Sequence, residues 1–160
     1  MELIPFNLIG ILAFIGATVY AVGDVLLLAS KASLDDYPKL KPFAKLLSDA
    51  EKMVVLSPTR LMWGSLIGVF STPLILIGFW HAHQGLGGVD AWAALAAFGL
   101  FGAASIIGTF VHGSFFYMGE YVHALNNVNE DSQPVIAGMM ERHKKVMVIT
   151  YAPLLIFIIA

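Results

Sequence analysis

Residues 91–126 read AWAALAAFGLFGAASIIGTFVHGSFFYMGEYVHALN, and this stretch decides the fold class of the chain. It contains no proline, lysine or arginine, so it reads as one uninterrupted helix. At the rise of an α-helix it would be roughly 54 Å long, whereas the hydrocarbon core of a bilayer is about 30 Å thick. The sequence therefore predicts a helix that crosses a membrane and projects beyond it, ending near Asn126.

Small and polar residues mark one face of this expected helix, because they recur at steps of three, four and seven residues. The opposite face carries leucine, isoleucine, phenylalanine and valine. A membrane helix with one small, polar face packs in a bundle with that face inward. The residues of this face are Ser105, Gly108, Thr109, His112, Gly119 and His123.

The composition of the whole chain agrees with a membrane protein. The chain is 58% hydrophobic and 12% charged, whereas soluble domains are about 45–50% apolar and about 25% charged. Apolar stretches at residues 8–30, 61–80, 92–115 and 146–160 predict four spans in a single membrane domain. The last stretch is short and ends on LLIFIIA without a polar residue, so we expect the natural chain to continue past Ala160.

The connection between the first two spans, residues 31–59, is the only sizeable polar segment. Its apolar residues follow helical spacing, which predicts a short amphipathic helix on the inner leaflet; a solvated connector is the alternative. The expected fold class is therefore an all-α integral membrane protein: a four-transmembrane-helix bundle with a short interfacial amphipathic helix after the first span. The apolar residues in question are Phe43, Leu46, Leu47, Ala50 and Met53.

The basic residues predict the orientation of the chain. All nine lysines and arginines fall within residues 31–60 and 142–145, and none lies before residue 31 or in the loop at 81–91. The positive-inside rule then places the N-terminus outside and both basic connections in the cytoplasm. We expect the protein in a cell membrane, the bacterial inner membrane, with the lipid bilayer as a partner. A formal net charge of −2 argues against a nucleic-acid partner.

Titratable residues gather in the half of the bundle that this orientation turns toward the cytoplasm. Asp24 lies roughly 10 Å inside the boundary marked by Lys31, where a carboxylate is costly unless it is paired, protonated or facing water. We expect Asp24 to face His112 across the interface of the first and third spans. Arg60 is expected either to bind lipid headgroups or to reach toward Asp24. The candidate ligand or proton site comprises Asp24, Arg60, His112, Glu120 and His123.

A metal centre is a second possibility at the cytoplasmic end. Glu120 and His123 stand at i, i+3, which is half of the di-iron carboxylate pattern, but the second Glu-x-x-His is absent. A mononuclear site of Glu120, His123 and His143 therefore stays open. His112 cannot join it, because His112 and His123 are roughly 16 Å apart along a straight helix.

Two main classes of function fit these residues. In the first, the protein binds or moves a small solute or a proton, which Asp24 and His112 exchange. Because four spans leave little room for a pathway, we then expect a homo-oligomer or a partner membrane subunit. In the second, it is a membrane-embedded enzyme, with or without a metal, acting on a lipid or quinone-like substrate. A third, blander class is an accessory subunit whose buried polar groups fix assembly. The sequence favours the first.

Overall fold

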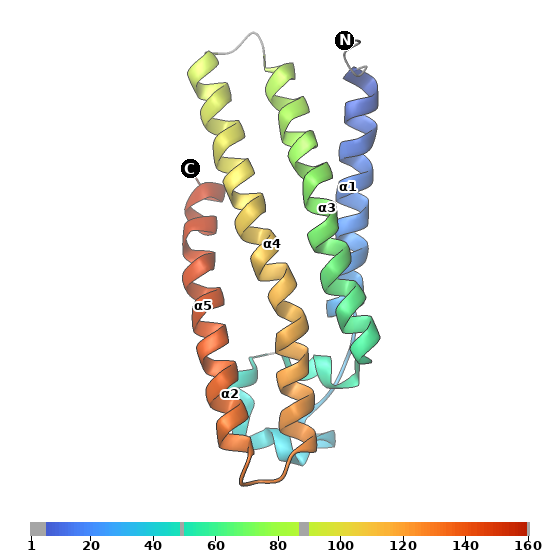
Figure 1. Ribbon diagram of the computed structural model, residues 1–160, viewed down its shortest axis with the longest axis vertical. Coiled ribbons are helices and arrows are strands. Elements are labelled where there is room, and N and C mark those ends of the chain that lie inside the picture. Colours follow the sequence, from blue (N-terminus) through green and yellow to red (C-terminus); the bar gives the residue numbers. More distant parts are fainter. Residues whose placement is uncertain (1–5, 49, 87–89, 160) are drawn as a thin grey trace.

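The computed structural model describes residues 6–48, 50–86 and 90–159, and all regular structure in these ranges is helical. Four long helices run up and down beside one another (Figure 1). The main contacts join α1 to α3, α3 to α4 and α4 to α5, so helices that follow one another in the chain are neighbours in space. These helices are α1 (Phe6–Leu28), α3 (Pro58–Gly85), α4 (Ala91–Asn127) and α5 (Gln133–Ile159).

Three of the described helices are long and apolar enough to cross a membrane: α1, α3 and α4, over Asn7–Leu28, Pro58–Gly85 and Ala91–Asn127. Only 17% of the most apolar window of α1 and of α4 is buried inside the protein, against 33% for α3. Most of the apolar surface of these helices therefore faces outward. Such surface is stable in contact with lipid and unfavourable in contact with water.

α5 differs from the other three long helices because its first half is charged. Glu141, Arg142, Lys144 and Lys145 all precede its apolar second half. The expected fourth span covered residues 146–160. α5 includes this stretch as far as Ile159, and Ala160 lies outside the described residues.

The connection from α1 to α3 is divided into short pieces rather than forming one amphipathic helix. It contains η1 (Leu34–Asp36), η2 (Pro38–Phe43), α2 (Ala44–Leu47) and η3 (Ala50–Val55). Prolines at 38 and 42 remove backbone donors that a longer α-helix would need. Ser48 then ends α2 after four residues by adopting a left-handed conformation, with φ 45° and ψ 63°.

The connection lies beside the ends of α4 and α5 that are joined to each other (Figure 1). The main cluster of buried apolar side chains includes residues of the connection and of these two helices. Leu40 and Leu47 of the connection belong to the same cluster as Val122, Leu125 and other residues of α4. Burying apolar side chains stabilises a protein where water surrounds it, and much less where lipid does. The C-terminal end of α4 is therefore packed like the core of a soluble protein.

α1 and α3, two of the helices long and apolar enough to cross a membrane, pack through glycines. A Cβ atom on Gly16 of α1 would lie 2.5 Å from the Cβ of Leu74, and one on Gly23 would lie 2.9 Å from the carbonyl oxygen of Gly64. Only glycine allows these two backbones to approach so closely.

Gly16→Ala should therefore push α1 away from α3 and lower the thermal unfolding temperature of the purified protein in detergent. Alanine favours a helix by about 1 kcal/mol over glycine, so any loss of stability measures the packing. Gly99→Ala in α4 is the matched control, because nothing lies within 4 Å of its added Cβ, and it should be neutral or stabilising. Equal unfolding temperatures for the two variants would contradict this packing.

Candidate functional site

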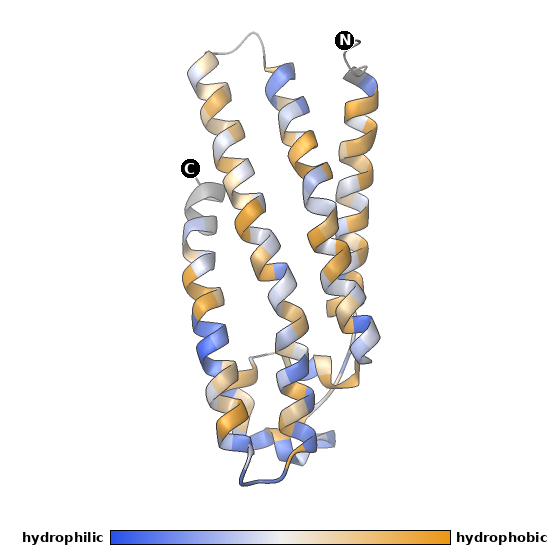
Figure 2. Cartoon of the chain, in the orientation of Figure 1, coloured by the Kyte–Doolittle hydropathy of each residue, from blue (hydrophilic) through white to orange (hydrophobic). Residues whose placement is uncertain are grey.

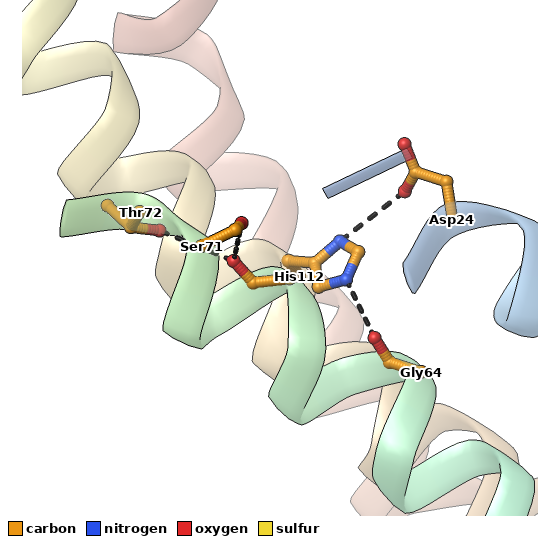
Figure 3. Close-up of polar contacts among 6 residues, drawn as sticks. Asp24, Gly64, Ser71, Thr72 and His112 are labelled. Carbon is orange, nitrogen blue, oxygen red and sulfur yellow. Dashed lines mark hydrogen bonds and ion pairs between the residues drawn. The ribbon is translucent and has the colours of Figure 1, made fainter. Parts of the chain in front are cut away.

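His112 of α4 is the polar centre of the interface between α1, α3 and α4 (Figure 3). Its side chain is only 2% exposed. Nδ1 lies 3.5 Å from Oδ1 of Asp24 on α1, and Nε2 lies 3.1 Å from the carbonyl oxygen of Gly64 on α3. The ring of Tyr20, one turn before Asp24, packs on the imidazole with the ring centroids 4.8 Å apart. One buried side chain thus contacts both neighbouring helices.

Glycines of α3 and α1 make the space that the imidazole fills. A Cβ atom on Gly68 would lie 1.9 Å from Nε2 of His112, and one on Gly23 would lie 3.3 Å from the same atom. Gly64, one turn before Gly68, supplies the carbonyl that the ring binds. The Gly64-x-x-x-Gly68 spacing therefore serves as a socket for His112 as well as a surface for helix packing.

The hydrogen bond from His112 to Gly64 restricts where protons can lie in the pair of Asp24 and His112. A carbonyl oxygen only accepts, so Nε2 of His112 must donate its hydrogen to Gly64. In a neutral imidazole the lone pair of Nδ1 would then face the carboxylate of Asp24 with no hydrogen between them. A favourable contact needs one more proton, either on Nδ1 of His112 or on the carboxyl of Asp24. In both arrangements the pair shares one proton and carries no net charge.

The two members of the pair differ in access. The side chain of Asp24 is 43% exposed, whereas that of His112 is 2% exposed. Among the described residues, Asp24 forms an ion pair with His112. The carboxyl of Asp24 is thus the more accessible member of the pair.

A cavity of about 290 Å³ lies next to this pair between the same three helices. Tyr20 borders both the cavity and the ring of His112. Thr72 and Ser105 bring hydroxyl groups to the mainly apolar wall of this cavity. The hydroxyl of Thr72 lies 2.7 Å from that of Thr109, which also donates to the carbonyl of Ser105 at 2.8 Å. The lining residues of the cavity include Tyr20, Thr72, Phe79, Phe101, Ser105 and Gly108.

Arg60 does not reach Asp24. Its Nε donates to the carbonyl of Leu26 at 2.8 Å, and Nη2 donates to the carbonyl of Ala29 at 2.9 Å. These carbonyls lie at the C-terminal end of α1, where the last turn contains no basic residue of its own. The guanidinium therefore caps α1 and stabilises the negative end of its dipole. Arg60 is a structural link between α1 and α3.

The remaining candidate residues lie toward the C-terminal end of α4 and on α5. His123 donates Nε2–H to the carbonyl of Leu56 at 2.8 Å, which holds the end of the connection against α4. The ring of His143 packs against that of Tyr121, with centroids 5.8 Å apart. Oε1 of Glu120 and Nε2 of His143 are buried without a hydrogen-bond partner in the described structure. Within the described ranges, no group of three or more His, Cys, Asp or Glu side chains is placed to hold a metal ion.

Sequence reasoning missed two contributors to the site. Gly68 is readable only as a helix-packing residue, because its role depends on which side chain of α4 meets it. Thr72 gives no signal of its own, since hydroxyl residues in membrane helices commonly bond to their own backbone. Gly64, Gly68 and Thr72 follow one another at steps of four residues, which places them on one face of α3. This spacing was the signal in the sequence that could have identified them.

Comparison with known proteins places the chain in a family without assigning it a role. The model of a protein family described as a family of unknown function (DUF6796) matches residues 4–160. No curated protein and no solved structure matches the chain. Any function must therefore be argued from the geometry of the site.

Gly68→Ala should displace His112, because the new Cβ would overlap Nε2 of the ring. The expected result is loss of the bond to Gly64, seen as a changed ring-nitrogen chemical shift of His112 in ¹⁵N-histidine NMR spectra. Gly108→Ala is the control, since its added Cβ meets nothing within 4 Å and it lies one turn before His112 on α4. Unchanged His112 signals in Gly68→Ala would show that the ring does not occupy this socket.

The pH dependence of stability tests the environment of His143, which precedes the apolar half of α5. Burial lowers the pKa of His143 from its ordinary value of 6.5. Below that value the unfolded chain binds the proton more readily than the folded chain, so stability falls as the pH drops toward the folded pKa and then levels off. His143→Gln should remove this contribution and flatten the unfolding temperature between about pH 7 and pH 5. Identical pH profiles of the unfolding temperature for the wild-type protein and His143→Gln would contradict a lowered pKa of His143.

Proposed function

The chain belongs to the family of unknown function DUF6796, and we propose that it binds a proton at the pair of Asp24 and His112 and couples it to binding or moving a small solute. The contact between a fully buried imidazole and a partly exposed carboxyl carries this proposal. Intramembrane ionisable groups are expensive to keep, which favours a functional role for them.

The proton balance of the pair supports the proposal. With one shared proton the pair is neutral; without it, an uncompensated negative charge would remain in an apolar environment. Any event that alters the surroundings of Asp24 therefore changes the tendency of the pair to hold its proton. Binding of a solute in the adjoining cavity would be such an event, because the solute would contact Tyr20, which packs on His112. Solute binding and proton binding are then coupled through one ring contact.

The membrane arrangement belongs to the same proposal. α5 serves as a short fourth span through its apolar second half, the N-terminus lies outside, and the connection from α1 to α3 lies in the cytoplasm. The exposed side of Asp24 is covered in the membrane by a second copy of the chain or a partner subunit. Such a partner would also enclose a pathway that a single chain of this size leaves open to lipid.

Asp24→Asn keeps the shape of the side chain and removes its proton, so it tests the shared-proton arrangement directly. Infrared pH titration of the wild-type protein in nanodiscs should show a carboxyl band and a histidine ring band changing at one midpoint. Both changes should be lost in Asp24→Asn, and the carboxyl midpoint should shift in His112→Gln. Asp90→Asn, at the start of α4, is the control for removing an acid away from the pair.

A second measurement separates function from architecture. Proteoliposomes of the wild-type protein should dissipate an imposed pH gradient faster than those of Asp24→Asn, as followed with an internal pH dye. If Asp24→Asn and His112→Gln lose thermal stability while gradient decay and the coupled titration stay unchanged, the pair serves only to stabilise helix packing. That result would favour the accessory-subunit alternative.

A further inference from the structure

A groove of about 860 Å³ lies between the connection and α5, away from the pair of Asp24 and His112. Phe43, Lys45 and Leu46 line it from the connection, and α5 lines it from Pro134 to Ile149. This stretch of α5 contains the change from its charged first half to its apolar second half (Figure 2). The groove therefore lies where the membrane surface meets the cytoplasm in the proposed arrangement.

The charged residues of the groove are mainly basic. Lys45, Lys144 and Lys145 face one carboxylate, that of Glu141, which leaves a surplus of two positive charges. Lys144 donates to the carbonyl of Leu46 at 2.8 Å, and an ammonium group has two further hydrogens to donate. Within the described ranges, Lys45 and Lys145 form no salt bridge. Three lysines therefore border the groove, two of them without an ion-pair partner there.

The rest of the groove is apolar. Val148 and Ile149 follow the lysines along α5 and are 60% and 62% exposed. Phe43 and Leu46 add apolar surface from the connection. A soluble anion would use the ammonium groups and leave this surface in contact with water. An amphiphile with an anionic head uses both parts.

We propose that this groove binds an anionic phospholipid. The phosphate group contacts Lys45, Lys144 and Lys145, and the acyl chains extend along Val148 and Ile149 into the bilayer. Opposite charge makes an anionic lipid favourable, whereas a zwitterionic lipid carries a cation of its own toward the lysines. Because the groove joins the connection to α5, a bound lipid would hold these two segments together.

Thermal unfolding in nanodiscs of graded composition tests this proposal. The unfolding temperature of the wild-type protein should rise as phosphatidylglycerol replaces phosphatidylcholine. The variant Lys45→Gln/Lys145→Gln should lose most of that rise, with Lys144 kept for its bond to Leu46. Lys31→Gln/Lys39→Gln is the matched control, because it removes the same charge from exposed lysines that do not line the groove. The control should keep the rise.

Glu141→Gln provides a second test in the opposite direction. Removing this carboxylate raises the surplus of positive charge in the groove, so the rise with phosphatidylglycerol should become steeper. An equal loss in both double variants would show a diffuse charge effect and overturn the groove as a site. Inorganic phosphate added to phosphatidylcholine nanodiscs should give no comparable rise; if it does, the site recognises free phosphate and the lipid assignment is wrong. Absence of any rise in the wild-type protein also overturns the proposal.

Discussion

The structure depends on how apolar side chains are packed at its two ends. Such side chains gain stability when they are buried away from water, but gain little when they leave lipid for the protein interior. α1 and α3 approach through Gly16, Gly23 and Gly64 and turn their large side chains outward. At the other end, the connection covers α4 with buried leucines and Met53. Both kinds of packing occur along α4, the longest of the described helices.

The site lies among the three helices that are long and apolar enough to cross a membrane, and its polar contacts join all three. His112 fills a space that two glycines leave, and its two ring nitrogens contact different helices. Because Nε2 is committed to a carbonyl, the protonation state of Nδ1 is tied to that of Asp24. Helix packing therefore fixes the orientation of the imidazole, with Nε2–H bonded to α3 and Nδ1 facing Asp24 of α1.

Much of this arrangement could be predicted from local sequence. The stretch at residues 91–126 contains no proline, and α4 ends at Asn127. The helical spacing of small residues placed Asp24 and His112 on facing surfaces, and the structure sets them 3.5 Å apart. Other features depend on contacts distant in sequence. Arg60 binds carbonyls of α1 rather than Asp24 because of where α3 begins. The break in the connection at Ser48 reflects a left-handed backbone conformation that spacing alone does not reveal.

The origin of the two partners on distant parts of the chain has a consequence for biosynthesis. Asp24 belongs to the first long helix to be made, while His112 follows 88 residues later. Chains are synthesised from the N-terminus, and α1 and α3 can pair as soon as both exist, through their glycines and Arg60. During that interval the imidazole of His112 is not yet beside Asp24. The contact between His112 and Asp24 therefore forms only after α4 has joined the pair of α1 and α3.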